Sequence, residues 1–419
     1  MNTADFKKRR ELFEKKLAKD AEGRPFLALI HSGKPGKLDR FSPDPCFYYF
    51  TGVECQEASY LVFNDGKKSS EALFLPPSNP IKARWEGGEL PSGALDTYGE
   101  PDAVRKKTMK ETGFGTILSN YGIQEFLEKS LDMLSFVYLD FSGSAGCTCA
   151  FPYEFREKLS KARPNIVFKN VRDIVVSLRN VKDAFEVSKI RESIDIAIEA
   201  QDAIMEFLTP GLHEYEIEAI VKYIFTLRGG QGEAFATIIG AGKNSTVLHY
   251  NKNRKKIEKN DMVVCDLGVR KDYYCSDLTR TYPASGKFSK AQIKYYEIVL
   301  EAQELSFRKA KAGVAIADIN KAVAELYKKK GVDKFNFHGV SHHLGIETHD
   351  GGTLDAPLQE GAVITIEPGL YYQKENIGVR IEDDILIRKN GCEVLSKELI
   401  KDIADIEKRM AKKRVKTIL

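Results

Sequence analysis

Two different patterns of apolar and polar residues divide the chain. In the first part, a charged amphipathic helix over 5–19 is followed by short apolar runs bounded by Gly, Pro, Asn or Asp. Such runs are typical of strands in a sheet that is covered on both faces. The predicted strands are 25–30, 59–63, 71–75 and 136–141, with helical stretches such as 122–130 between them. This alternation predicts an α/β domain.

The second part opens with an apolar run over 173–178, which we predict to be a strand, and continues into a long helix. Apolar residues recur at helical spacing from Val187 to Leu208, interrupted once by Gln201, and a Thr-Pro-Gly sequence ends the helix. A new amphipathic pattern therefore starts near residue 172 without a long linker. The predicted domains are 1–172 and 173–419.

Helices and antiparallel strands then follow in the same order twice. Helices are expected over 214–228, 289–311 and 315–330, strands over 234–240, 246–250, 362–369 and 378–388, and a hairpin over 261–269 and 273–282. Helices followed by strands, twice, predict an α+β domain with two similar halves around antiparallel sheet.

The composition narrows the class of protein. With 42% apolar and 10% aromatic residues, the chain can bury a large core, which excludes a disordered protein. A net charge of +4 is nearly balanced, so we expect no nucleic-acid or membrane-surface partner. No apolar run is long enough to cross a bilayer, and the basic amino-terminal segment lacks the apolar stretch of a secretory signal.

The cysteines point to a reducing compartment. Seven is an odd number and too sparse for a disulfide scaffold, so we expect reduced thiols and a cytoplasmic protein. Cys147 and Cys149 form a C-x-C sequence, but no second pair follows at zinc-finger spacing, and we assign no metal to them.

Two pairs of acidic residues lie on apolar strands. Asp266 and Asp277 are an odd number of residues apart, so a two-residue turn at 271–272 would place them directly opposite each other. Glu367 and Glu382 repeat the odd spacing. A single acidic residue of this kind can simply face water at a sheet edge. Two buried pairs, however, would repel unless a proton or a cation lay between the carboxylates, which favours a metal site.

Four of the seven histidines fall in the short segment HGVSHHLGIETH. A lone histidine is more often a core or surface group, whereas a glycine-flanked cluster is a candidate for metal binding or proton transfer. Four carboxylates and one neutral imidazole would be neutralised by two divalent cations, and oxygen-rich sites suit ions such as Mn²⁺. Two such ions side by side can activate water and polarise an amide carbonyl. The clustered histidines are His338, His342, His343 and His349.

These motifs resemble the pita-bread metallopeptidases, the group that holds methionine aminopeptidase, aminopeptidase P and prolidase. Its five ligands run Asp, Asp, His, Glu, Glu, and VVCDLG, CSDLTRTY, HGVSHHLG, TIEPGLYY and GVRIEDD supply them in that order. The resemblance implies that Asp277 and Glu382 bridge two metal ions, that Asp266 binds one ion and that His342 and Glu367 bind the other. Glu367 would also move the proton of an attacking hydroxide that bridges the metals.

The resemblance extends to substrate-binding groups. His249 in GAGKNSTVLHY, together with His338 and His349, matches histidines that contact substrate or assist proton transfer in the family. Arg380 matches an arginine behind the metal-bound carboxylates. His343 stands where the family often has an aromatic residue, so either a structural or a functional role is open.

The first domain discriminates within this group. CFYYFTGVECQEASYLVF and ARWEGGEL resemble the amino-terminal domain of the aminopeptidase P family. The sole tryptophan, Trp85, could be an ordinary core residue or a lid over the active site of a neighbouring subunit, because these enzymes are usually oligomers.

The resemblance thus implies a metal-dependent aminopeptidase that hydrolyses the bond between an amino-terminal residue and a following proline. The expected cofactors are two Mn²⁺ ions, with Co²⁺ or Zn²⁺ as alternatives, and the expected partners are proline-containing peptides and further copies of the chain in a homodimer or homotetramer. An Xaa-Pro dipeptidase (prolidase) with the same chemistry stays open as an alternative. A binding protein that has lost catalysis is disfavoured, because all five ligands are present.

Overall fold

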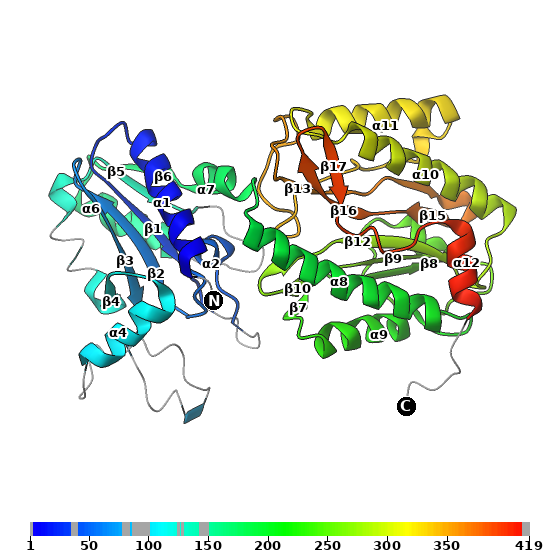
Figure 1. Ribbon diagram of the computed structural model, residues 1–419, viewed down its shortest axis with the longest axis horizontal. Helices are drawn as coiled ribbons and strands as arrows, with labels where there is room; N and C mark the ends of the chain where they lie inside the picture. Colours follow the sequence, from blue (N-terminus) through cyan, green and yellow to red (C-terminus); the bar gives the residue numbers. More distant parts are fainter. Residues whose placement is uncertain are drawn as a thin grey trace. The chain divides into compact units, whose positions relative to one another are not determined.

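The computed structural model separates the chain into two compact units, Met1–Leu178 and Arg179–Leu419 (Figure 1). Part of the predicted helical stretch 122–130, most of the ARWEGGEL segment and the pair Cys147 and Cys149 lie outside the described residues. The described residues are 3–34, 41–77, 84–85, 101–123, 126, 130–141 and 151–412.

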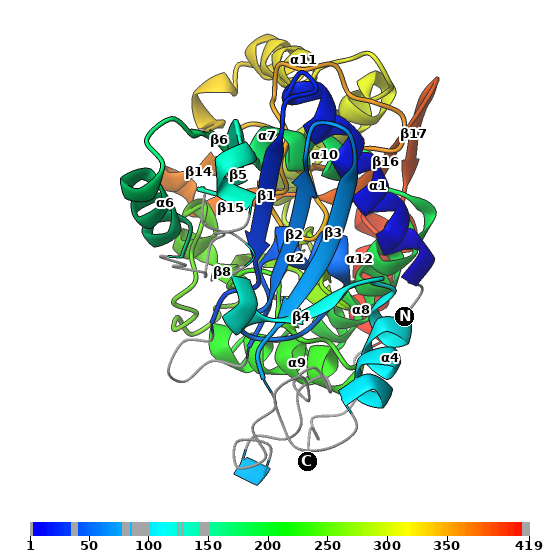
Figure 2. The same ribbon diagram turned by 90° about the vertical axis from the view of Figure 1, so that its left-hand side faces the viewer.

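A six-stranded mixed sheet forms the centre of the first unit, with the strand order β4-β3-β2-β1-β5-β6 (Figure 2). Strand β1 is antiparallel to β2 and parallel to β5. The strands are β1 (Phe26–His31), β2 (Ser59–Asn64), β3 (Ser69–Leu75), β4 (Ile117–Ser119), β5 (Phe136–Leu139) and β6 (Val167–Asn170). The helices are α1 (Thr3–Asp20), α2 (Pro45–Thr51), α4 (Pro101–Thr112), α6 (Phe151–Ala162) and α7 (Arg172–Arg179).

Both faces of this sheet are covered, as the predicted α/β class requires. Because side chains alternate along a strand, Leu27 and Leu29 of β1 enter one apolar cluster, which Phe155 of α6 completes. On the α1 side, the ring of Phe13 stacks on Phe50 of α2 at 4.4 Å between centroids. The described part of the unit also contains the short 3₁₀ helices η1 (Asn120–Gly122) and η2 (Leu131–Met133).

The strand predicted over 173–178 is wrong, because this segment is helix α7. The β-branched run Ile-Val-Val favoured a strand. Val171, Val175 and Leu178, however, are all buried at intervals of three and four residues, which is the period of a helix and not of a strand. The predicted domain boundary near residue 172 falls at the first residue of α7.

The second unit repeats the order of helices followed by strands, in agreement with the predicted α+β class of two halves. The first half holds α8 (Ala184–Phe207), α9 (Glu214–Leu227), β7 (Gly232–Glu233), β8 (Ile238–Ala241), η3 (Gly242–Thr246), β9 (Met262–Leu267), β10 (Val269–Lys271), β11 (Tyr274–Cys275) and β12 (Leu278–Pro283). The second half holds α10 (Lys290–Lys309), α11 (Ile316–Lys330), η4 (Asp333–Phe335), β13 (Val363–Ile366), β14 (Gly369–Tyr372), η5 (Gln373–Glu375), β15 (Ile377–Arg380), β16 (Asp383–Arg388), β17 (Gly391–Val394) and α12 (Ile403–Ala411).

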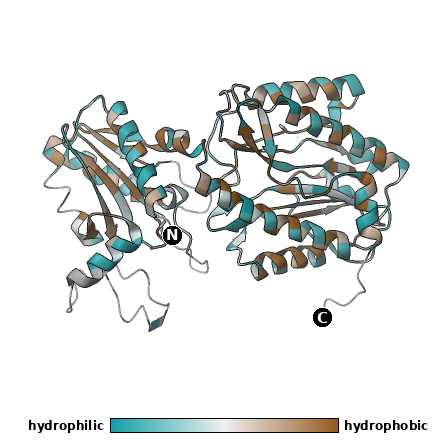
Figure 3. Cartoon of the chain, viewed as in Figure 1, coloured by the Kyte–Doolittle hydropathy of each residue, from teal (hydrophilic) through white to brown (hydrophobic). Residues whose placement is uncertain are grey.

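The helices of the second unit lie against short antiparallel sheets. The strand orders are β12-β9-β8, β11-β10-β7, β13-β16-β17 and β14-β15. Many of the strands are coloured as apolar in Figure 3, whereas the helices carry both apolar and polar faces. Gln201, the one polar residue in the stripe of α8, is buried and donates to the backbone carbonyls of Cys265 and Leu278. It therefore joins the helix to the sheet that carries Asp266.

The hairpin around Asp266 has a different turn from the predicted one. Its two loop residues are Asp272 and Tyr273, both with positive φ, at 48° and 71°, the geometry of a type I′ turn. Asp266 consequently faces Thr279, not Asp277. The shift moves each pair by an even number of residues, so Asp266 and Asp277 keep the same face of the hairpin as diagonal neighbours.

Two further strand predictions changed in the structure. The segment 246–250 is not a strand: η3 ends at Thr246 and a turn follows. Within 234–240, only the end belongs to β8. In contrast, Ile366 faces Asp383 and Gly369 faces Arg380, so the unbroken register places Glu367 opposite Glu382, as their odd spacing predicts.

Candidate active site

Every candidate site residue taken from the sequence lines one cavity of about 310 Å³ in the second unit. The predicted metal ligands and the predicted substrate-binding groups share its wall. These residues are Asp266, Asp277, His342, Glu367, Glu382, His249, His338, His349 and Arg380. The rest of the wall includes the apolar side chains of Phe235, Ile238 and Leu248.

Strand ends from both halves of the unit bring the acidic groups together. Asp266 lies on β9, and Asp277 directly precedes β12. Glu367 follows β13, and Glu382 lies between β15 and β16. The backbone N–H of Glu382 donates to the carbonyl oxygen of Thr279 on β12, which links the two halves at the site.

His342 is placed among these carboxylates by the loop before β13. Its Nε2 lies 3.4 Å from Asp277 Oδ2 and 3.8 Å from Glu367 Oε1. Donor atoms of Asp277, His342 and Glu382 lie within 4.8 Å of one another. The Nδ1 of His342 lies 3.0 Å from the carbonyl oxygen of His343, and because a carbonyl only accepts, Nδ1 carries the proton. The lone pair of Nε2 is therefore directed at the acidic cluster, as a metal ligand requires.

Burial makes this carboxylate cluster costly without cations. It raises the pKa of Asp277 and of Glu382 well above the usual carboxyl range, and the neighbouring carboxylates raise both further. Burial also raises the pKa of Glu367 to about 7, although His342 and Arg380 oppose this shift. Among the described residues, Asp266 Oδ1 is buried without a hydrogen-bond partner. An orphaned oxygen and three carboxyl groups that resist ionisation fit a site built for divalent cations.

Arg380 holds two of the carboxylates in place through hydrogen bonds. Its Nη2 lies 2.7 Å from Asp266 Oδ2, and its Nε donates to Thr279 Oγ1 at 3.2 Å. The Thr279 hydroxyl in turn donates to Glu382 Oε2 at 2.7 Å. One guanidinium thus fixes one oxygen of Asp266 directly and one oxygen of Glu382 through Thr279, and leaves the other oxygens toward the cavity.

Tyr371 belongs to the same network, and the sequence analysis missed it. Its hydroxyl accepts a hydrogen bond from Arg380 Nη1 at 2.8 Å and lies 2.7 Å from His338 Nε2. The available signal was the strand period of two, because Gly369 and Tyr371 follow Glu367 on the same face. A tyrosine on a buried strand is more often a core residue.

The three other cavity histidines differ in exposure. His338 Nδ1 donates to the carbonyl oxygen of Gly339 at 2.7 Å and lies 3.6 Å from Glu367 Oε2. Burial lowers the pKa of His338 to about 4, so its imidazole is neutral near pH 7 and its Nε2 accepts from Tyr371. Burial also lowers the pKa of His349, whose ring lies 4.4 Å from that of His342. His249 lines the cavity as an exposed residue.

His343 and Trp85, whose roles were open, have contrasting surroundings. His343 is buried, and its backbone pairs with that of Ile364. A Cβ atom added to Gly352 would lie 2.1 Å from the His343 ring, so glycine is needed there to make room. These contacts favour the structural role of His343. Trp85 is 85% exposed, so its interpretation as a core residue is wrong.

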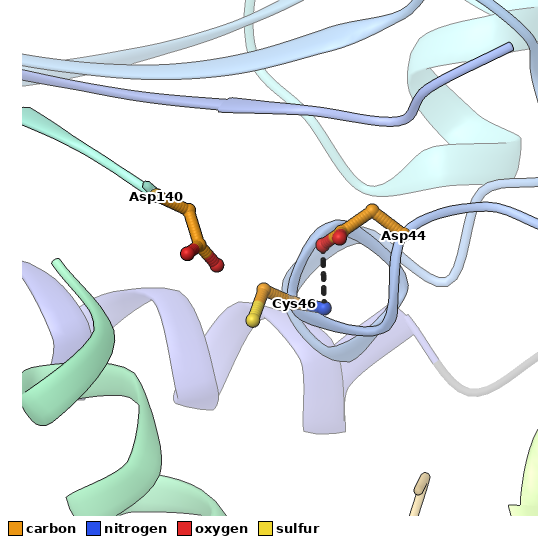
Figure 4. A group of neighbouring side chains, drawn as sticks. All are labelled: Asp44, Cys46 and Asp140. Carbon is orange, nitrogen blue, oxygen red and sulfur yellow. Dashed lines mark hydrogen bonds between the residues drawn. The ribbon is translucent and has the colours of Figure 1, made fainter. Parts of the chain in front are cut away.

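A second group of potential ligands lies in the first unit (Figure 4) and consists of Asp44, Cys46 and Asp140. Asp44, however, caps helix α2: its Oδ1 accepts from the backbone N–H groups of Cys46 and Phe47 at 2.8 and 3.1 Å. Arg172 Nη1 lies 3.9 Å from Cys46 Sγ. Capping explains the position of Asp44, and we assign no metal to this group.

The described residues include five of the cysteines predicted to be reduced and most of the helices. Each described cysteine is free, namely Cys46, Cys55, Cys265, Cys275 and Cys392. None of the helices in the described part of the chain has the length and apolarity needed to cross a bilayer.

The comparison with known proteins agrees with this site. The model of metallopeptidase family M24 matches residues 188–389, and that of the aminopeptidase P amino-terminal domain matches residues 30–119. An Xaa-Pro dipeptidase from Pyrococcus horikoshii is 36% identical over 79% of this chain and 91% of its own length. The chain belongs to metallopeptidase family M24. The chain therefore contains a metallopeptidase domain, which holds the metal-binding cavity, and an aminopeptidase P-type domain that precedes it in the sequence.

A curated sequence and a solved structure, both from Escherichia coli, extend the likeness over most of the length of this M24 peptidase. An Xaa-Pro aminopeptidase is 30% identical, with 88% of each chain covered. The solved structure of zinc-substituted aminopeptidase P in complex with product superposes with a TM-score of 0.85 at 27% identity and covers 99% of each chain. Both predicted domain types, and their order along the chain, are thus shared with aminopeptidase P.

Proposed function

We propose that this protein is an Xaa-Pro aminopeptidase, which releases an amino-terminal residue that precedes proline. One observation carries the proposal: the five donors Asp266, Asp277, His342, Glu367 and Glu382 converge on a single cavity in an M24 chain that also has the aminopeptidase P amino-terminal domain. The relatives named Xaa-Pro aminopeptidase cover both parts of the chain.

The donor set suits two divalent cations, and Mn²⁺ is our first choice because four of the five donors are carboxylates. Asp277 and Glu382 would bridge the pair, Asp266 would hold one ion, and His342 with Glu367 would hold the other. Bound there, the ions supply Lewis-acid chemistry that polarises a peptide carbonyl and activates water.

The chain's own side chains divide the remaining work. Glu367 lines the cavity, where its carboxylate can take a proton at one step and return it to the leaving proline nitrogen at a later one. His338 is held in a fixed tautomer by Gly339 and Tyr371, so it presents a defined hydrogen-bonding edge beside Glu367. His249 and His349 lie on the same cavity wall, where we assign them contacts to the substrate and to its tetrahedral intermediate.

A prolidase is the second candidate, because the Pyrococcus horikoshii relative bears that name. The two functions differ in peptide length, so one comparison separates them. The Mn²⁺-loaded enzyme should cleave an Xaa-Pro-Yaa tripeptide and release the free first residue. Cleavage restricted to the matching Xaa-Pro dipeptide would assign a prolidase, and cleavage of neither peptide would refute both functions.

Two further parts of the proposal concern assembly and location. The large exposed ring of Trp85 suits contact with a second copy, and we propose a homodimer or homotetramer. Light scattering after gel filtration should give a multiple of the 47.1 kDa chain, and a monomer would contradict it. The free cysteines support a cytoplasmic location, which cell fractionation with an antibody to the native chain would check.

A further inference from the structure

A short segment after η3 supplies part of the cavity wall while one of its residues is anchored elsewhere. Leu248, His249 and Asn251 line the cavity. Tyr250, between them, instead donates its hydroxyl to Glu214 Oε2 at 2.7 Å. This segment has no strand partner to hold it, because η3 has ended and β9 has not begun. The hydrogen bond of Tyr250 thus anchors the residue next to His249.

Glu214 is the centre of that anchor. It is fully buried in the first turn of α9. Its Oε1 accepts from the backbone N–H of Ala241 at 2.8 Å and from Asn244 Nδ2 at 3.0 Å. Its Oε2 accepts from the Tyr250 hydroxyl and from the backbone N–H of Lys255, at 2.7 and 2.8 Å. One side chain thus connects four points of the chain between the end of β8 and the approach to β9.

Only a carboxylate satisfies these four donors. Both of its oxygens accept, whereas an amide would turn one position into a donor that faces donors. The amino-terminal end of α9 also favours a negative group. The Tyr250 hydroxyl is held from its other side too, since it accepts from the backbone N–H of Arg254 at 3.3 Å. Burial raises the pKa of Tyr250, so the phenol keeps the proton that it donates.

The far side of η3 is fixed independently. Ser245 Oγ accepts from the backbone N–H of Gly378 on β15 at 2.7 Å. An added Cβ at Gly378 would lie 1.9 Å from the Ser245 carbonyl oxygen, so the two segments are in direct backbone contact. The start of the segment is thus secured against the strand that carries Arg380. Its end is secured by the buried Asn253, whose side chain accepts from the backbone N–H of Ile239 and donates to the carbonyl oxygen of Thr237. Between these two ends, the hydrogen bond of Tyr250 to Glu214 holds the residue next to His249.

We propose that Glu214 and Tyr250 are positioning residues, which set the place of His249 at the active-site cavity and through it the efficiency of peptide hydrolysis. This inference rests on the proposed function for its kinetic consequence. Neither residue lines the cavity, so both act through the segment that His249 occupies.

The test is a double-mutant cycle on the Mn²⁺-loaded enzyme with an Xaa-Pro-Yaa tripeptide. Tyr250→Phe removes one hydroxyl and should lower kcat/KM about tenfold, the factor that a hydrogen bond to a charged acceptor commonly carries. Bound metal should equal that of the wild type. In a His249→Ala background, the same change should alter kcat/KM by less than about twofold, because its route of action is gone. Tyr223→Phe, at a tyrosine that is 63% exposed, is the matched control.

Multiplicative effects of the two substitutions would overturn the proposal, as would an unchanged kcat/KM in Tyr250→Phe. A second measurement is independent of turnover: hydrogen–deuterium exchange of the segment 244–252 should be faster in Tyr250→Phe and in Glu214→Gln. If the wild type cleaves no proline peptide, the proposed function fails, and the exchange alone decides the positioning. Exchange at the wild-type rate in Tyr250→Phe would refute it.

Discussion

Glu367→Gln should make the metal-free protein more stable at neutral and alkaline pH, although it removes a metal ligand. Glu367 is partly buried among carboxylates, and its pKa in the folded protein is raised to about 7 from an ordinary 4.5. The folded state therefore binds this proton more tightly than the unfolded state does. The associated stabilisation is fully present below pH 4.5 and is lost as the pH rises through about 7.

The size of the effect follows from the shift. At about 1.4 kcal/mol for each pKa unit, the wild type should lose about 3 kcal/mol of unfolding free energy from this group by pH 8. Glutamine is neutral at every pH and nearly isosteric, so it avoids that loss. With metal bound, the wild type should be more stable than Glu367→Gln. The cations stabilise the ionised carboxylate of the wild type and bind the variant less tightly.

The assay is urea unfolding, followed by circular dichroism, of EDTA-treated protein at pH 5 and pH 8. Glu325→Gln on the exposed face of α11 is the matched control and should leave both values unchanged. Metal-free Glu367→Gln that is no more stable than the wild type at pH 8 would refute the raised pKa of Glu367. A difference in stability between the two proteins that is as large at pH 5 as at pH 8 would refute it equally.

Three other outcomes are expected. Tyr371→Phe should lower kcat/KM about tenfold without loss of bound metal, since it cuts the link between Arg380 and His338; steady-state kinetics with metal analysis checks this, and parallel loss of metal would count against it. Arg280→Met should cost about 3–5 kcal/mol in urea unfolding, because it removes the buried cation 2.7 Å from the Asp383 carboxylate and leaves Lys401, at 3.6 Å, as its partner; a cost below 1 kcal/mol would be evidence against that role. Divalent metal should bind more tightly as the pH rises through about 7, because Glu367 must release its proton; a pH series of calorimetric titrations with a flat profile would contradict this.

The residues of the candidate site could be predicted from the sequence because the patterns that mark them are local. Strand side chains alternate with a period of two, so the odd spacings of Asp266 with Asp277 and of Glu367 with Glu382 put each pair on one face. That conclusion survived a wrong turn position, since an even shift in register does not exchange the faces. The clustering of histidines marked the loop of His342 in the same way.

The errors have physical causes that a single sequence hides. The turn at Asp272 and Tyr273 requires two residues with positive φ, and tyrosine seldom adopts that conformation. The helix α7 carries a β-branched run, and tertiary burial at helical spacing overrode its propensity. The segment at 246–250 is shaped by Glu214, a residue far away in the chain, so its local pattern of apolar residues misled the prediction.

Hydrolysis of the Xaa-Pro bond should depend on two divalent ions, which the buried carboxylate cluster would hold. The most direct test titrates metal-free enzyme with Mn²⁺ and follows hydrolysis of an Xaa-Pro-Yaa tripeptide, with Asp277→Ala and the exposed Asp355→Ala in parallel. We expect no activity without metal, full activity at two ions per chain, none in Asp277→Ala and wild-type behaviour in Asp355→Ala. Undiminished hydrolysis in the metal-free protein or in Asp277→Ala would contradict it.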